Sequence, residues 1–193
     1  KQPAIIEGVE EGIIKGIYKL KTVEAKENFK VKLLGSGSIF QQVLSAADVL
    51  ANEYGISSEI YSVTSYNELT REAQNVERDN LLDIEGANKT AYVDEVLGSD
   101  DENIIISATD YMKSYSEQIA PFVKGHFKAL GTDGFGRSDS RGNLRKFFEV
   151  DSDFIVFTTL AQLANAGKIE KSVVTEAMKK FNIDANKINP LKA

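Results

Sequence analysis

The chain contains no cysteine, no tryptophan and a single histidine, His126, among its 193 residues. Without cysteine it cannot be a disulfide-stabilised scaffold, and this composition fits a reducing compartment such as the cytoplasm. One histidine and no cysteine leave too few of the usual ligands for an ordinary zinc site. A Ser-His-Asp triad would depend on His126, and no Gly-x-Ser-x-Gly turn accompanies it. We therefore expect His126 to be an ordinary residue at a strand edge.

Long apolar runs are absent as well. No segment approaches the roughly 20 apolar residues that cross a bilayer, and no basic start followed by an apolar stretch marks a signal peptide, so no membrane partner is predicted. The net charge of −6 argues against a general nucleic-acid role. The hydrophobic content of 42% is enough for a substantial core, which predicts one large domain.

Strand-like and helix-like segments alternate along the chain, which predicts an α/β fold with a largely parallel sheet. The predicted strands cover residues 13–23, 29–34, 60–64, 104–106 and 127–130. Helices are predicted over residues 39–54, 67–82, 91–97, 143–150, 153–166 and 172–181, and a further one carries Tyr115, Ile119 and Phe122 after possible caps at 107–110. Residues 154–157 by themselves favour a strand, but a cap at Asp151 or Ser152 and a stop at Gly167 favour a helix.

The turn Gly35-Ser36-Gly37-Ser38 lies between a predicted strand and a predicted helix, which is the arrangement of a phosphate-binding turn. The dinucleotide fingerprint needs a third glycine three residues after the second, and Phe40 stands there instead. No Gly-Lys-Ser/Thr triplet of a Walker loop occurs. We expect a turn with Ser38 as helix cap and close helix packing at both glycines, with an anion site as the alternative.

A second glycine-rich loop runs from Leu130 to Arg141, with three glycines, two arginines and two aspartates. The plainer interpretation is a strand-to-helix turn pinned by Asp and Ser side chains, and the sharper one is an interface or ligand loop. Gly134 and Gly136 are expected in conformations that a Cβ would strain. The candidate interface or anion-binding residues of the two loops are Gly35, Ser36, Gly37, Ser38, Gly134, Gly136, Arg137, Ser138, Asp139 and Arg141.

Charged side chains of the second loop carry a further expectation. We expect ion pairs or backbone hydrogen bonds of Arg137, Asp139 and Arg141 to hold the loop against another domain or a second subunit. The alternative is that these charges pair inside the loop itself. Asp110 follows another predicted strand end, the edge where open α/β sheets bind ligands, but helix capping explains it without a ligand. Lys187, in the polar C-terminal tail, is expected to be a surface residue.

Five segments occur in one order along the chain: 33–38, 60–69, 107–113, 130–141 and 181–190. In that order they closely resemble the C-terminal domain of the homodimeric bacterial pyruvate dehydrogenase first component, a thiamin-dependent decarboxylase. The Phe-Gly-x-Ser piece at residues 135–138 is similar to the broader transketolase C-terminal domain. The resemblance covers nearly the whole chain, from about residue 10 onward.

The resemblance implies a three-layer α/β/α domain with a five-stranded mixed sheet, whose first strand is antiparallel to the rest. It implies that residues 1–12 are the remnant of an interdomain linker and that 13–193 form a single transketolase C-terminal-like domain. A first residue other than Met agrees with a fragment. The parent enzyme would be a cytoplasmic homodimer that converts pyruvate to CO2 and passes an acetyl group to the lipoyl group of an acetyltransferase core, using thiamin diphosphate and magnesium.

The thiamin diphosphate motif of that family begins Gly-Asp-Gly and ends further along in Asn, whereas residues 131–134 here read Gly-Thr-Asp-Gly. No catalytic, cofactor-binding or metal-ligating residue is therefore assigned. We expect an inactive structural and assembly domain, with the missing N-terminal and middle domains, a second subunit and the acetyltransferase core as partners. The alternative is a free-standing α/β domain that binds a small anion at one of the two glycine loops.

Overall fold

The structure is a computed structural model that describes residues 3–26, 30–86 and 88–193. Its strands are β1 (Ile17–Val23), β2 (Lys30–Gly35), β3 (Ser57–Val63), β4 (Ile104–Ala108) and β5 (His126–Leu130). Its α-helices are α1 (Glu10–Lys15), α2 (Phe40–Tyr54), α3 (Tyr66–Leu82), α4 (Tyr92–Leu97), α5 (Lys113–Glu117), α6 (Arg141–Phe147), α7 (Ser152–Asn165) and α8 (Lys171–Lys180). Short 3₁₀ helices are η1 (Gly37–Ile39), η2 (Ala120–Phe122) and η3 (Pro190–Lys192).

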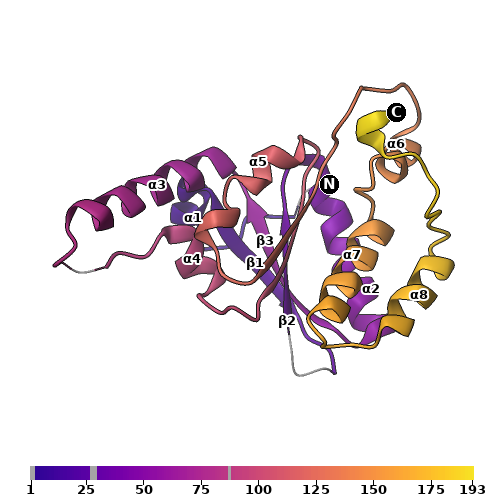
Figure 1. Cartoon of the computed structure of the whole chain (residues 1–193), viewed down its shortest axis with the longest axis horizontal. Coiled ribbons are helices and arrows are strands. Elements are labelled where there is room, and N and C mark those ends of the chain that lie inside the picture. Colours follow the sequence, from indigo (N-terminus) through magenta and orange to yellow (C-terminus); the bar gives the residue numbers. More distant parts are fainter. Residues whose placement is uncertain (1–2, 27–29, 87) are drawn as a thin grey trace.

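The five strands form one mixed sheet in the order β1-β3-β2-β4-β5 (Figure 1). Strand β1 is antiparallel to β3, and the other neighbours are parallel, which confirms the expected sheet. All parallel strands therefore end at the same edge, where the loops after β2, β4 and β5 lie together. No helix among the described residues is long and apolar enough to cross a membrane.

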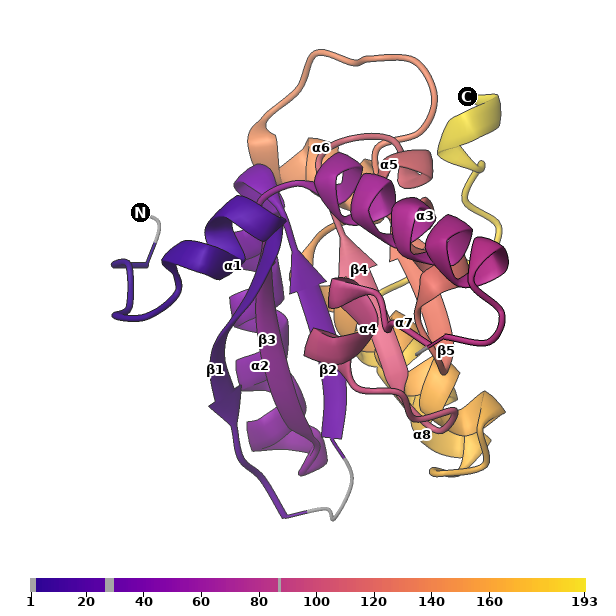
Figure 2. The same ribbon diagram turned by 90° about the vertical axis from the view of Figure 1, so that its left-hand side faces the viewer.

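Helices cover both faces of the sheet, so the domain has three layers (Figure 2). Side chains of a strand alternate between the two faces. Leu33 and Ile106 accordingly belong to the core beneath α2 and α7, whereas Leu34 and Ile105 belong to the core beneath α3 and α4. All four side chains are fully buried, which explains why 104–106 is an unbroken apolar run.

Three sequence expectations about local structure are wrong. Residues 13–15 belong to α1, which ends at Gly16, so the first strand starts only at Ile17. The side chain of Ser38 does not cap α2, because η1 precedes that helix and its N-cap position is Ile39. The helix expected after residues 107–110 shrinks to α5, whose N-cap residue Met112 offers no side-chain hydrogen bond.

The remaining predicted elements are confirmed within a few residues. Residues 153–166 are helical in α7, where the Asp151 side chain caps the helix by accepting a hydrogen bond from the Phe154 amide. The second strand begins at Lys30, and the expected residue 29 lies outside the described residues. His126 is an exposed residue of edge strand β5, as expected. The expected linker boundary between residues 12 and 13 falls inside α1.

Candidate functional site

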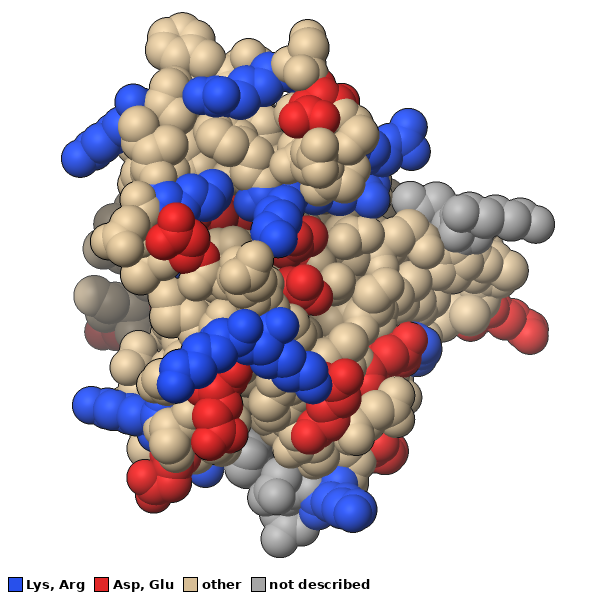
Figure 3. All heavy atoms as spheres, turned by 90° about the vertical axis from the view of Figure 1, so that its right-hand side faces the viewer, with Lys and Arg blue, Asp and Glu red and all other residues tan. Residues whose placement is uncertain are grey.

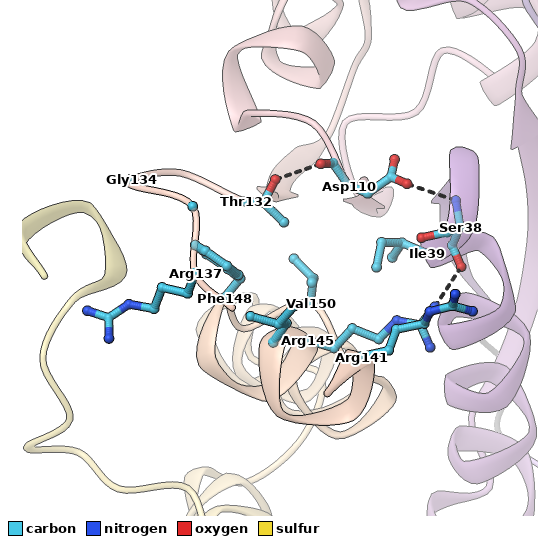
Figure 4. Close-up of a pocket in the computed structure, with 12 residues that line it drawn as sticks. Ser38, Ile39, Asp110, Thr132, Gly134, Arg137, Arg141, Arg145, Phe148 and Val150 are labelled. Carbon is cyan, nitrogen blue, oxygen red and sulfur yellow. Dashed lines mark hydrogen bonds between the residues drawn. The ribbon is translucent and has the colours of Figure 1, made fainter. Parts of the chain in front are cut away.

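A cavity of about 320 Å³ opens at the carboxyl edge of the parallel strands, beside the loops that follow β2, β4 and β5 (Figure 4). It is lined by Ser38, Ile39, Asp110, Thr132, Gly134, Gly136, Arg137, Arg141, Leu144, Arg145, Phe148 and Val150. The two glycine loops singled out in the sequence therefore meet across one cavity. They are joined there by the loop after β4 and by α6.

Asp110 links the loop after β4 to the loop after β2. Its Oδ2 accepts a hydrogen bond from the backbone N–H of Ser38 at 3.0 Å, and its backbone oxygen accepts one from the Thr132 hydroxyl at 2.6 Å. Gly37 has φ +56°, and a Cβ built there would lie 2.3 Å from Asp110 Oδ1. The glycine thus allows the carboxylate to approach this backbone closely. Asp110 does not cap α5, the next helix along the chain, but binds the first turn of η1 instead.

Arg141 and Arg145 bring positive charge to the cavity from successive turns of α6. The Nη2 of Arg145 donates a long hydrogen bond of 3.4 Å to the backbone oxygen of Ser38. The Arg141 side chain makes no hydrogen bond or ion pair within residues 3–26, 30–86 and 88–193, and the Arg145 side chain makes no ion pair there. Figure 4 shows both side chains extending toward Ser38.

The third arginine of the lining, Arg137, is arranged differently. Its guanidinium carbon lies 4.2 Å from the centre of the Phe147 ring, which is a cation–π distance, and the group points away from the cavity (Figure 4). Asp139 Oδ1 instead accepts hydrogen bonds from the Ser140 amide at 2.6 Å and from Asn143 Nδ2 at 2.8 Å. These two bonds, led by that of Asn143, lower the pKa of Asp139.

The expected ion pairs with a neighbouring domain or subunit stay a prediction, and within this chain the charges of the loop are arranged as follows. Arg137, Asp139 and Arg141 form no ion pair with any described residue. The bonds of Asp139 stay within the loop and the start of α6, in line with the alternative of internal pairing. Arg137 is held against α6 by an aromatic ring rather than by a carboxylate.

The two glycines of this loop differ from each other. Gly134 has φ +102°, and a Cβ there would lie 2.3 Å from the backbone oxygen of Pro190, which confirms the expected strain. The same expectation is wrong for Gly136, because a Cβ there would meet no atom within 4 Å and its φ lies outside the left-handed region. In Figure 1 the C-terminal segment that contains Pro190 lies beside this loop.

Other predicted residues lie outside the cavity. Gly35 ends β2 and packs against Phe40 of α2, in agreement with the expected helix packing. Ser36 is buried, and its hydroxyl donates to Thr109 Oγ1 at 2.7 Å. Ser138 is exposed and does not line the cavity.

Tyr66 lies close to this buried hydroxyl pair, and its oxygen is 2.6 Å from Ser107 Oγ. Burial raises the pKa of Tyr66, while hydrogen bonds with Ser107 and Ser36 oppose that rise. The phenol therefore stays neutral and serves as part of a buried polar network beneath the loops.

Arg145 and Phe148 line the cavity but were not among the predicted site residues. Arg145 could have been found from its i, i+4 spacing to Arg141, which places both side chains on one helix face. That signal was hidden because the helix was expected to begin at residue 143 rather than at 141. Nothing local in the sequence marks Phe148 as a cavity residue.

The described residues do not fit a thiamin diphosphate and magnesium site. Asp133, the acidic residue of the nearest motif-like segment, accepts a hydrogen bond from the Lys113 amide at 3.1 Å and lies 3.5 Å from the Lys113 ammonium. It is thus engaged in holding the start of α5. No group of three or more metal-ligating side chains occurs in the part of the chain that the structure describes.

The surface that includes the α7 and α8 side of the molecule carries mixed charges. Figure 3 shows Lys and Arg side chains interspersed with Asp and Glu across this face. A nucleic-acid surface gathers basic side chains on one face or in one stripe. This face does not have that character.

Comparisons with known proteins agree with the fold. The family model of the transketolase-like TK C-terminal domain matches residues 16–151. The pyruvate dehydrogenase E1 component of Escherichia coli (strain K12) is 50% identical over 189 residues, which is 97% of this chain and 21% of that protein. The same-named protein of Haemophilus influenzae is 47% identical over 194 residues, which is 100% of this chain and 22% of that protein.

Solved structures agree as well. Transketolase from Leishmania mexicana matches with a TM-score of 0.53 and 21% identity, covering 80% of this chain and 19% of that structure. At this identity the likeness shows the fold alone. The chain spans about a fifth of the length of the curated relatives it matches.

Proposed function

Because the chain belongs to the transketolase-like C-terminal domain family, we propose that it is the C-terminal structural and assembly domain of a pyruvate dehydrogenase E1 component. The observation that carries this proposal is the 50% identity to the E. coli E1 component across 97% of the chain. The matched part is only 21% of that relative. The parent's activity would then need the other domains.

In this proposal the parent decarboxylates pyruvate with thiamin diphosphate and magnesium and transfers the acetyl group to a lipoyl group of an acetyltransferase core. It would do so in the cytoplasm as a homodimer. The present chain would supply packing surfaces and no reacting group. The contacts of Asp133 with Lys113 support a non-catalytic role for this chain. Asp133 is the acidic residue of the segment nearest to the thiamin diphosphate motif, and it already has a structural partner.

Exposed apolar side chains near the carboxyl edge support an assembly role. Tyr111 and Met112, in the loop after β4, are 60% and 54% exposed, and the Tyr111 ring lies 5.3 Å from that of Tyr115. Phe135, in the loop after β5, is exposed too. Large apolar groups clustered on a surface mark contact sites. The expected contact is with the parent's other domains or its second subunit.

Three measurements test the proposal. Calorimetric titration of the isolated chain with thiamin diphosphate and magnesium should give no saturable heat, and the chain should release no CO2 from pyruvate above the buffer blank. In the full-length protein, the double substitution Tyr111→Ser and Met112→Ser should weaken the dimer or lower its melting temperature. Ile84→Ser, at an 82% exposed position between α3 and α4, is the matched control and should change neither. Decarboxylation by the isolated chain would refute the proposed role.

A further inference from the structure

Two guanidinium groups at the cavity lack acidic partners. The Arg141 guanidinium has no polar partner within the described residues, and that of Arg145 has one long bond, to the Ser38 carbonyl oxygen. The one carboxylate of the lining, Asp110, accepts the Ser38 amide and comes from the loop after β4, across the cavity from α6 (Figure 4). The lining therefore has surplus positive charge on its α6 side.

The Ser38 hydroxyl adds a hydrogen-bonding group beside these arginines. It makes no hydrogen bond with the described residues, and it is directed into the cavity (Figure 4). A serine hydroxyl can donate to an anionic oxygen. The loop after β2 and the helix after β5 thus place three donor side chains around one opening at the sheet edge where α/β folds bind ligands.

Below these donors the cavity is apolar. Ile39 and Val150 are almost fully buried, and Leu144 and Phe148 are half-buried beside them. The volume of about 320 Å³ lies at the lower end of the range of roughly 300–1,000 Å³ that small-molecule sites occupy. An apolar floor with a few convergent polar groups is the usual composition of such sites.

We propose that this cavity binds a small phosphorylated molecule, with its phosphoryl group held by Arg141, Arg145 and the Ser38 hydroxyl and its organic part on the apolar floor. Arginine offers a planar fork of N–H donors that suits phosphate oxygens. Two such cations match a phosphate monoester, whose charge near neutral pH is about −1.5 to −2, better than a singly charged carboxylate. Arg145 exchanges its long bond to Ser38 for contacts with the ligand.

The test uses inorganic phosphate and phenyl phosphate as probes. Their binding is measured by calorimetry and by ³¹P line broadening. It is measured both with this chain and with the full-length protein saturated with thiamin diphosphate and magnesium. Phenyl phosphate should bind more tightly than inorganic phosphate, since only it covers the apolar floor. Arg141→Gln and Arg145→Gln should each weaken binding by about tenfold, and the double variant should abolish it. Arg145→Lys keeps the charge but loses the planar fork of donors, so its affinity should lie between those of the unchanged protein and Arg145→Gln.

Arg137→Gln is the matched control. Arg137 lines the same cavity, but its guanidinium lies over Phe147 and points away, so affinity should stay within about twofold. Equal weakening by Arg137→Gln and Arg141→Gln would show general charge attraction and overturn the proposal. Acetate binding as tightly as phosphate, or phosphate binding unchanged in the double variant, would overturn it too. Binding to this chain but not to the full-length protein would show that another domain covers the cavity, which also refutes a ligand site.

Discussion

Lys187 ties the C-terminal segment to the end of α6. Its ammonium donates to the Phe147 backbone oxygen at 2.6 Å and to Glu149 Oε1 at 2.8 Å. It also lies 5.3 Å and 5.7 Å from the ring centres of Phe147 and Phe154. The expectation of a simple surface lysine is therefore wrong. The backbone oxygen that Lys187 binds lies 40 residues earlier in the chain, beyond the reach of any local pattern.

Replacing this lysine should consequently cost stability. Lys187→Met keeps the length of the side chain but removes the donors, and we expect the free energy of unfolding to fall by about 1–3 kcal/mol. Urea unfolding followed by circular dichroism measures this loss. Lys192→Met, at an exposed position of η3, is the control and should change the free energy by less than about 0.5 kcal/mol. Equal losses of stability in both variants would contradict a stabilising role for the Lys187 hydrogen bonds.

The two glycines of the loop after β5 make a second paired prediction at this scale. Gly134→Ala should lower the free energy of unfolding by about 1–3 kcal/mol, since it combines a left-handed φ with a contact to the Pro190 backbone. Gly136→Ala should be neutral or slightly stabilising, because its Cβ position is open. Melting temperatures of the two variants check this. A larger loss at residue 136 would mean that the loop has another conformation.

At the scale of elements, β3 carries a charged side chain between two neighbouring strands. Glu59 is bound by Lys32 of β2, its register partner, at 2.7 Å and also by Lys19 of β1. Burial raises the pKa of Glu59, but the hydrogen bonds from Lys19, Lys32 and Tyr61 outweigh it and hold the pKa at about 2. The ionised carboxylate thus joins three strands at one end of the sheet.

This arrangement predicts a pH dependence of stability. The folded-state pKa of Glu59 lies below the ordinary value of 4.5, so its contribution is complete above about pH 4.5 and is lost as the pH falls toward 2. Glu59→Gln should lower the free energy of unfolding by about 1–2 kcal/mol at pH 7. It should also reduce the loss of stability between about pH 4.5 and pH 2. Chemical unfolding between pH 2.5 and 7 measures both effects. Glu24 forms an exposed pair with Lys30, and Glu24→Gln should leave this acid dependence of stability unchanged.

On the scale of the whole molecule, the end of the chain returns to the carboxyl edge of the sheet. Pro190 is buried, and its backbone oxygen lies against Gly134, while Lys187 binds the end of α6 (Figure 1). The final residues thus support the loop and the helix that line the cavity. Their effect on the site is indirect, since none of the cavity-lining residues comes from beyond Val150.

Removal of residues 182–193 should therefore loosen this edge. We expect faster amide exchange in residues 131–147, while β2 and β4 keep their protection, because buried strands open only with the whole core. Hydrogen–deuterium exchange with mass spectrometry resolves the two regions. Removal of residues 1–8, of which 3–8 are all exposed, is the control and should leave the exchange of both regions unchanged. Unaltered exchange in the loop of the shortened chain would show that it holds its shape without the tail.

The sequence by itself determined the position of the five strands and of most helices, since their apolar periods and caps, such as Asp151 for α7, are local properties. It also pointed to the family through its ordered segments. Only the tertiary structure decided which loops share a cavity. Asp110 reaches Ser38 across 72 residues and Arg145 reaches it across 107, because the order β2-β4-β5 brings these strand ends together. Strand order depends on packing among distant segments, which no local pattern encodes.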